Sequence, residues 1–193
     1  MNQKEESPEF ILKKPNMAIA KFVNFKIKHE DWNLYRIEDG SLLRGRIVLS
    51  GVLVEGSENI KEKVKKNRKS ELKLTFRSNR IFAIESPPES RGPPDFNRYT
   101  TKELRSFIVR EDLDFETIKE IWNVYELENG IRLKLRLSPT SISRTSKFDS
   151  GGIPIYLIDA VMNAKIQLPE DMRKIIRKSI EKQKITIRTK EKF

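Results

Sequence analysis

Apolar and polar residues alternate over short stretches of the chain, which is the pattern of β-strands that bury one face. β-Branched and aromatic residues over 18–27 predict a first strand. A turn is predicted at Gly40. The strand after the turn alternates apolar residues on one face: Leu43, Gly45, Ile47 and Leu49. Two further strands over 72–76 and 81–84 complete the first half of the chain.

The pattern of this first half returns ninety residues later. The segments 32–46 and 122–136 match without a gap, and seven of the fifteen positions are identical. Both segments place Asp or Asn before a Gly, which favours a hairpin turn with positive φ. A second block, 71–89, matches 152–170 at an offset of eighty-one. These spacings indicate a duplicated small domain, since solenoid repeats are much shorter.

The two offsets differ because the second copy is about nine residues shorter than the first. The missing residues belong to a polar loop, which runs over 55–70 in the first copy and is reduced to a turn over 147–152 in the second. Strands are predicted in the second copy over 133–137, 153–157 and 161–166. Short antiparallel strands joined by tight turns hide their edges best by closing into a small barrel.

We therefore predict a mainly β protein with minor α content: a tandem duplication of a small antiparallel SH3-like or OB-like barrel, followed by a C-terminal basic amphipathic helix. The predicted divisions are a flexible N-terminal segment, a first barrel, a Pro-rich linker, a second barrel, and the basic helix with its tail, over residues 1–16, 17–90, 91–98, 99–168 and 169–193.

The C-terminal helix is predicted from Pro169 at its first position and from acidic residues in its first turn. One stripe of the helix is apolar, and its members are Met172, Ile175, Ile176 and Ile180. The rest of the helix surface is basic. A shorter helix is predicted over 99–104.

The residue types present exclude several classes of site. There is no cysteine, so disulfides, thiolate metal sites and cysteine nucleophiles are ruled out. The one histidine, His29, is interpreted as a surface residue rather than a catalytic base. No Gly-rich phosphate loop occurs. We expect no cofactor, no metal site and no catalytic activity, although a hydrolase that uses a pair of carboxylates stays open.

No apolar run approaches the roughly 18 residues that cross a bilayer, and the N-terminal residues lack the hydrophobic core of a signal peptide. We therefore expect a cytoplasmic protein without a membrane partner. Its high content of Lys, Glu and Ile is typical of proteins adapted to heat.

The charge balance indicates a class of partner. The 39 basic residues exceed the 28 acidic ones, for a net charge of +11, and such an excess favours a polyanionic ligand. The excess is uneven, because residues 111–130 carry one basic and seven acidic groups. The carboxylates of Glu111, Asp112, Asp114 and Glu116 could bind a hard cation, but a solvated acidic face, or an internal partner for the basic helix, is the preferred interpretation.

Three groups of cations are candidates for phosphate contacts. The first lies on the predicted outer strand faces: Arg44, Arg46, Arg132, Lys134 and Arg136. The second lies in the loop that only the first copy has: Lys61, Lys63, Lys65, Lys66, Arg68 and Lys69. The third lies on the C-terminal helix: Arg173, Lys174, Arg177, Lys178 and Lys182. Each group has a simpler alternative as a solvated, charged surface.

The repeated aromatic residues Trp32/Trp122 and Tyr35/Tyr125 allow two interpretations. Exposed rings could stack on nucleic-acid bases. Aromatic residues kept in both copies are more often shared core, and that is the preferred interpretation.

The segment 35–47 resembles the opening of Sm-like RNA-binding domains, in which a strand, an Asp-Gly or Asn-Gly turn and a strand with an internal Gly follow one another. Residues 159–163 resemble the Asp-x-x-Met-Asn of that family. The likeness covers about twenty residues and concerns small-barrel organisation, since the second motif of the family, Ile-Arg-Gly, does not occur.

Together these observations favour a non-catalytic module that binds nucleic acid, either DNA or RNA, or a ribonucleoprotein. The alternative is an adaptor or structural module that docks on an acidic protein partner. The apolar stripe of the C-terminal helix separates the two, because an exposed stripe would favour the adaptor.

Overall fold

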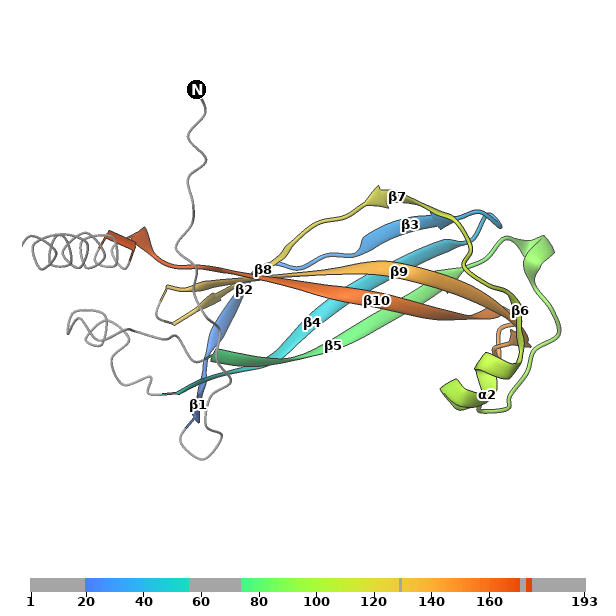
Figure 1. The fold of residues 1–193 in the computed structure, drawn as a ribbon, viewed down its shortest axis with the longest axis horizontal. Helices are drawn as coiled ribbons and strands as arrows, with labels where there is room; N and C mark the ends of the chain where they lie inside the picture. The colour runs from blue at the N-terminus through green and yellow to red at the C-terminus, as the bar shows by residue number, and fades with distance from the viewer. Residues whose placement is uncertain (1–19, 56–73, 129, 171–172, 175–193) are drawn as a thin grey trace, which may run out of the picture.

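The computed structural model describes residues 20–55, 74–128, 130–170, 173 and 174, and it shows a mainly β protein. The described chain forms two antiparallel sheets of five strands each, which run along the length of an elongated molecule (Figure 1). We call them sheet 1 and sheet 2.

Sheet 1 is organised around the long strand β4 (Leu42–Glu55). Strand β5 (Leu74–Glu85) pairs with β4 along one edge. The other edge is shared, because β3 (Asn33–Ile37) pairs with the first part of β4 and β1 (Ala20–Val23) pairs with the last part. Strand β7 (Phe115–Lys119) pairs with β3 and completes the sheet.

Sheet 2 has the same plan around β9 (Arg132–Phe148). Strand β10 (Pro154–Gln167) pairs along one edge, while β8 (Asn123–Leu127) and β6 (Ile108–Arg110) share the other. Strand β2 (Phe25–His29) pairs with β8 on the outside. The two sheets thus exchange their outer strands, since β2 comes from the first half of the chain and β7 from the second.

Residues ninety positions apart occupy corresponding places in the two sheets. The pairing of β3 with β4 has the same register as that of β8 with β9. Gly40 and Gly130 end their turns with positive φ, at 84° and 77°, as predicted for both hairpins. The pairing of β4 with β5 shifts by one residue at Ser50, and that of β9 with β10 shifts at the corresponding Thr140. A common origin of the two halves stays a prediction.

Strand pairing places residues of β5 and β10 that lie eighty-two positions apart at corresponding sites in the two sheets. The offset of eighty-one predicted for the block 71–89 is therefore wrong by one residue. Arg44 lies opposite Ala83 in sheet 1, and Lys134 lies opposite Lys165 in sheet 2. Because Arg44 corresponds to Lys134, Ala83 corresponds to Lys165. Lys165 thus lies opposite a predicted lysine.

Two core clusters hold the molecule together, and each takes residues from both sheets. The first core joins β8 and the start of β9 to the end of β4 and the start of β5. Its buried members are Ile47, Leu49, Val52, Val54, Leu74, Tyr125, Leu127, Ile131, Leu133, Leu135, Leu137 and Leu168. The second core joins β3 to the far end of sheet 2. Its buried members are Tyr35, Ile37, Leu43, Leu113, Ile142 and Tyr156. Each half of the chain therefore depends on the other for its buried surface.

The predicted closed barrels are not present in the described chain, which forms open sheets instead. The buried faces of the long strands are nevertheless as predicted, since the alternating apolar residues of β4 and β9 are buried. Both strands contribute residues to both cores. A strand that serves two cores extends past the point at which a small barrel would close.

Two strand boundaries also differ from the predicted ones. The predicted strand over 18–27 is interrupted at Asn24, which separates β1 in sheet 1 from β2 in sheet 2. The two strands predicted after the loop in each copy are one continuous strand, β5 in the first and β10 in the second. No Gly or Pro interrupts either strand at the predicted break.

The linker between the halves begins with the 3-10 helix η2 (Pro88–Ser90) and packs against sheet 2. The N–H of Gly92 donates to the carbonyl of Gly152 (3.0 Å) in the turn between β9 and β10. Helix α2 (Thr101–Ser106) follows, close to the predicted position, and a capping box at Thr100 begins it.

Several predictions concern residues outside the described part of the chain: the flexible segment 1–16, most of the Lys-rich loop, and residues 171, 172 and 175–193 of the predicted C-terminal helix and tail. Of that predicted helix the structure describes residues 169, 170, 173 and 174, and the N–H of Arg173 donates to the carbonyl of Pro169 (3.0 Å). In the part of the chain that the structure describes, no helix is long and apolar enough to cross a membrane.

Candidate nucleic-acid interface

Two corresponding networks of Tyr, Glu and Arg join the sheets. In the first, the Tyr35 hydroxyl donates to Glu120 Oε2 (2.9 Å) and lies 3.1 Å from the carbonyl oxygen of Leu137. Arg136 forms an ion pair with Glu120 (3.0 Å). Burial, together with the hydrogen bond to Glu120, raises the pKa of Tyr35. This network connects β3 of sheet 1 to β9 of sheet 2.

In the second network, the Tyr125 hydroxyl donates to Glu30 Oε2 (2.6 Å) and lies 3.2 Å from the carbonyl oxygen of Ile47. Arg46 forms an ion pair with Glu30, whose side chain is 5% exposed. Burial, together with the hydrogen bond to Glu30, raises the pKa of Tyr125. Each glutamate follows an exchanged strand, so the networks hold the exchange in place.

Buried asparagines reinforce both networks. The side-chain amides of Asn33 and Asn123 each donate, at 2.8 Å, to the same carbonyl oxygen that the neighbouring tyrosine approaches. Tyr35 and Tyr125 are themselves buried. The preferred interpretation of these tyrosines as shared core is confirmed, and base stacking on them is excluded by their burial.

The outer face of sheet 2 carries unbalanced positive charge. Lys134 on β9 and Lys165 on β10 are direct cross-strand neighbours, an arrangement that is unfavourable for like charges. Among the described residues, no carboxylate forms an ion pair with either lysine. Arg136 lies on the same face, two residues from Lys134. Its buried Nε has no hydrogen-bond partner within the described chain.

Trp122 lies among these cations. The guanidinium carbon of Arg136 and the ammonium nitrogen of Lys165 each lie 4.8 Å from the centre of its ring system, within the range of cation–π attraction. The indole is half-buried. We call Trp122, Lys134, Arg136 and Lys165 the basic face.

The corresponding outer face of sheet 1 is balanced. Arg44, which takes the place of the first lysine of the basic face, forms an ion pair with Glu85 (2.8 Å). Ala83 takes the place of the second lysine. Trp32 has Arg46 beside its ring, at 5.7 Å. Sheet 1 therefore shares the geometry of the basic face without its excess charge.

The predicted strand-face cations lie on the outer faces, but most have carboxylate partners. The ion pairs are Arg44–Glu85, Arg46–Glu30, Arg132–Glu126 and Arg136–Glu120. Lys134 is the exception among the five. On the predicted helix, Arg173 donates to the carbonyl of Leu168 (2.7 Å) and Lys174 pairs with Glu170 (3.0 Å). The other predicted cations lie outside the described residues: Lys61, Lys63, Lys65, Lys66, Arg68, Lys69, Arg177, Lys178 and Lys182.

Most of the net charge belongs to two segments of the sequence. The described residues carry 22 basic and 19 acidic groups, whereas the rest of the chain carries 17 basic and nine acidic groups. Segments 56–73 and 175–193 supply seven basic groups each. Val54, Leu74 and Leu168, which lie near the end of β4, at the start of β5 and just after β10, all belong to the first core. The end of β4, the start of β5 and the end of β10 therefore lie at the same end of the molecule (Figure 1).

A buried charged network lies at the opposite end. Asp39, in the turn between β3 and β4, accepts hydrogen bonds from the Tyr156 hydroxyl (2.6 Å) and the Ser41 N–H (3.0 Å), and lies 3.5 Å from Arg144. Burial alone would raise the pKa of Asp39, but these hydrogen bonds outweigh it and hold the pKa below its usual range. Burial and the bond to Asp39 raise the pKa of Tyr156 to about 12. The polar groups satisfy one another, which indicates a structural role.

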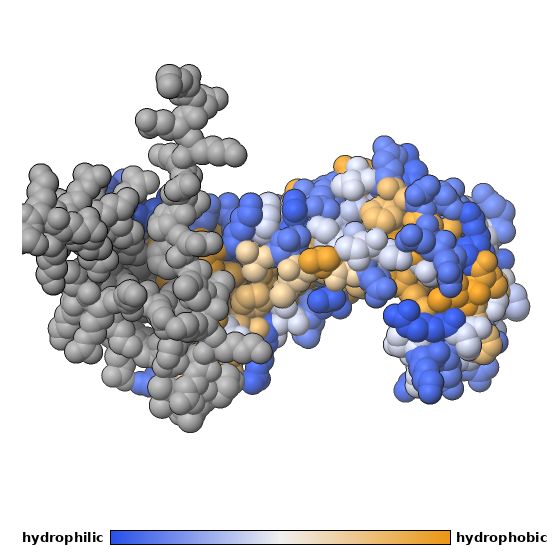
Figure 2. All heavy atoms as spheres, viewed as in Figure 1, coloured by the Kyte–Doolittle hydropathy of each residue, from blue (hydrophilic) through white to orange (hydrophobic). Residues whose placement is uncertain are grey.

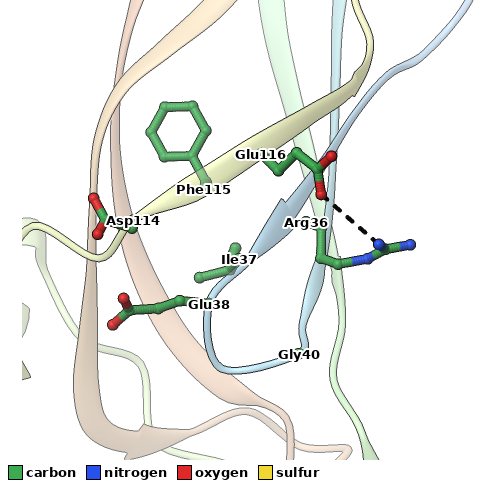
Figure 3. Close-up of a pocket in the computed structure, with 7 residues that line it drawn as sticks. All are labelled: Arg36, Ile37, Glu38, Gly40, Asp114, Phe115 and Glu116. Atoms are coloured by element: carbon green, nitrogen blue, oxygen red, sulfur yellow. Dashed lines mark ion pairs between the residues drawn. The ribbon is translucent and has the colours of Figure 1, made fainter.

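An open pocket of about 440 Å³ lies beside the same turn (Figure 3). Its lining residues are Arg36, Ile37, Glu38, Gly40, Asp114, Phe115 and Glu116. Two of its carboxylates have cationic partners, since Glu116 lies 3.8 Å from Arg36 and Glu38 forms an ion pair with Arg110. Nowhere in the described residues do three or more His, Asp or Glu side chains form a group that could hold a metal ion.

No protein-family model, curated protein or solved structure matches the chain.

Sequence reasoning missed three residues of this arrangement. Glu30 and Glu120 lie ninety positions apart, as do Phe25 and Phe115, so extending the first repeat towards the N-terminus would have found them. Lys165 was missed for a different reason. No pairing register between β9 and β10 was predicted, so its position opposite a predicted lysine stayed hidden.

Proposed function

We propose that the protein is a non-catalytic nucleic-acid-binding module that contacts phosphates through the basic face. The observation that carries the proposal is the cross-strand pair of Lys134 and Lys165. Like charges directly opposite each other on a sheet oppose folding, and no carboxylate in the described chain balances these two. A phosphate between the ammonium groups would remove the repulsion. Ligand binding therefore explains why a pair of lysines that opposes folding is present.

The two basic segments of the sequence support the same proposal. The cations of the basic face alternate along β9 with Leu133, Leu135 and Leu137, which belong to the first core. Val54, Leu74 and Leu168, near the end of β4, at the start of β5 and just after β10, belong to that core as well. The basic face thus lies over the same core as the strand ends that lead into both segments, so a polyanion bound to the face would lie near these strand ends.

Contacts of this kind are mainly to phosphate, so we expect binding that depends strongly on salt and weakly on base sequence. Fluorescence anisotropy of the full-length protein with labelled oligonucleotides of mixed sequence measures both properties. At about 50 mM salt, Lys134→Glu/Lys165→Glu should weaken binding about 10-fold to 100-fold, and the dependence on salt should become shallower.

The matched control is Lys102→Glu/Arg105→Glu on α2, which changes the net charge by the same amount at the other end of the molecule. Both residues are exposed. We expect this control to lower the affinity only slightly. Equal losses in the two double variants would mean that net charge alone drives binding, and unchanged affinity in the first would remove the basic face from the interface.

A second candidate function, docking on an acidic protein partner, is favoured by Phe96. Its side chain is 82% exposed, yet its loop is held in place, because Asp95 accepts hydrogen bonds from the Tyr99 hydroxyl (2.6 Å) and the Asn97 N–H (2.9 Å). A rigidly presented aromatic side chain is typical of an anchor at a protein interface. Apolar surface is also visible at the end of the molecule that carries β6 and α2 (Figure 2).

The charges near Phe96 fit an acidic partner. Arg98, Lys102 and Arg105 are exposed, while Glu103 is occupied by the capping box of α2. Affinity capture with the wild type, Phe96→Ala and Lys134→Glu/Lys165→Glu separates the two functions. A protein lost only with Phe96→Ala would support the adaptor, and identical captures with all three proteins would count against it.

A further inference from the structure

We infer that the ligand of the basic face is a single-stranded nucleic acid, with Lys134 and Lys165 on its backbone and one base stacked on Trp122. This inference rests on the proposed function and narrows it to one class of ligand.

The two lysines are placed to act together on one strand. Cross-strand neighbours lie about 5 Å apart at their Cβ atoms, so both ammonium groups can contact the same short stretch of backbone. Arg136 continues the row along β9. A single strand is flexible enough to follow such a row on a sheet, whereas the phosphates of a duplex are held on a rigid curved surface.

The region also lacks an element that would read the bases of a duplex. Proteins read duplex DNA with a helix or a two-stranded ribbon that enters a major groove about 12 Å wide. The described residues around the basic face lie within the paired strands β8, β9 and β10 and project no such element. Helix α2 has six residues and lies at the opposite end of the molecule (Figure 1).

Trp122 supplies an aromatic surface for a base, whereas the cations around it contact the phosphates. Its indole is half-buried, and the exposed Lys165 lies over its ring at 4.8 Å. A phosphate attracts an ammonium group more strongly than an aromatic ring does. When a phosphate draws Lys165 away, the ring becomes available to the neighbouring base, and aromatic stacking of this kind is common in proteins that bind single strands.

Trp32 is the natural control because it takes, beside sheet 1, the place that Trp122 takes beside sheet 2. Its neighbour Arg46 is held by the buried carboxylate of Glu30, and Ala83 takes the place of the second lysine. Since the chain has two tryptophans, Trp32→Phe leaves Trp122 as the sole indole, and Trp122→Phe leaves Trp32.

The test titrates both full-length variants with a single-stranded DNA, a single-stranded RNA and the matching DNA duplex, following tryptophan fluorescence and anisotropy. In Trp32→Phe, single strands should quench the fluorescence and bind about tenfold more tightly than the duplex. In Trp122→Phe, single strands should leave the fluorescence unchanged and bind about tenfold more weakly than to the wild type. A thermal melt of each variant establishes that it is folded. If Trp122→Phe does not fold, quenching in Trp32→Phe decides.

Each outcome has a distinct meaning. Quenching of Trp122 by either single strand, with weaker binding of the duplex, supports the inference. Equal binding of single strands and duplex without quenching overturns it and leaves the proposed function intact, provided that Lys134→Glu/Lys165→Glu still lowers the affinity. Absence of binding to all three nucleic acids at low salt overturns both.

Discussion

The outer faces of the two sheets have the same backbone pairing and different charge. On sheet 1, Arg44 has a carboxylate partner and the residue opposite it is Ala83. On sheet 2, the corresponding positions are Lys134 and Lys165, and no carboxylate in the described chain balances them. One pattern of strand pairing therefore carries both a neutral surface and a charged one.

What the two faces share is equally informative. Both contain a tyrosine, a glutamate and an arginine in the same arrangement, and both networks connect the two sheets. The shared groups connect the two sheets, whereas Lys134 and Lys165 form no ion pair with a carboxylate of the described chain. The difference between the faces is therefore the better guide to function.

Removal of the two glutamates should give the largest loss of stability. Each glutamate is the carboxylate partner of an arginine and of a tyrosine hydroxyl, so its removal leaves both without that partner. The Glu30 side chain is 5% exposed and that of Glu120 is 20% exposed. Glu30→Ala should therefore lower the free energy of unfolding by about 3 kcal/mol, and Glu120→Ala by about 2 kcal/mol. Urea unfolding measures both. Glu85→Ala, which removes an exposed partner, should cost well under 1 kcal/mol, and a cost equal to that of Glu30→Ala would contradict this account.

The two hairpin turns provide the next comparison. Gly40 and Gly130 both have positive φ, so alanine at either position should cost about 1–2 kcal/mol. The added Cβ would lie 3.2 Å from Pro169 at Gly130 and 3.5 Å from Pro87 at Gly40. Gly130→Ala should therefore be the more destabilising of the two in thermal unfolding, and the reverse order would show that the prolines move aside freely.

Replacement of the network tyrosines, Tyr35 and Tyr125, tests how much each hydroxyl stabilises the protein and how that stabilisation depends on pH. Tyr35→Phe and Tyr125→Phe should each cost about 1–2 kcal/mol at neutral pH, because each loses a buried hydrogen bond to a carboxylate. The folded protein raises the pKa of both hydroxyls. Their stabilisation is thus complete below the unfolded pKa of about 10 and is lost as the pH rises through the folded pKa.

The expected observation is a difference in slope. Above about pH 10, the free energy of unfolding should fall more steeply with pH for the wild type than for Tyr35→Phe/Tyr125→Phe. Urea titrations across this range measure both slopes. Parallel slopes would show that the two hydroxyls ionise as readily in the folded protein as in the unfolded chain.

Much of the local structure could be predicted from the sequence, because it depends on neighbouring residues. The alternation along β4 and β9 gave the correct buried faces, and the Gly residues of the repeated segments marked both turns. Local patterns determine which face of a strand is buried. They do not determine which strand lies beside it.

The exchange of strands shows this limit clearly. Strands β2 and β7 have the pattern of outer strands in either sheet, and a single irregular residue, Asn24, directs β2 away from the strand that precedes it. The charge balance of the faces was hidden for a similar reason. Lys165 lies opposite Lys134 only because the pairing of β9 with β10 shifts by one residue at Thr140, and no sequence pattern announces that shift.

The smallest expected effect is also the most direct test of the comparison, because it should have opposite signs at corresponding positions. Lys134→Gln relieves the repulsion with Lys165 and leaves the contact of Lys165 with Trp122 in place. It should therefore raise the free energy of unfolding by about 0.5 kcal/mol at low salt. Arg44→Gln removes an exposed ion pair and should lower it by a similar amount. Urea unfolding of both variants at low salt and at about 1 M salt measures the two changes, and both should shrink at the higher concentration because exposed charges are screened there. Loss of stability in both variants would mean that Lys134 has a stabilising partner, and the unbalanced charge of the basic face would no longer require a ligand to explain it.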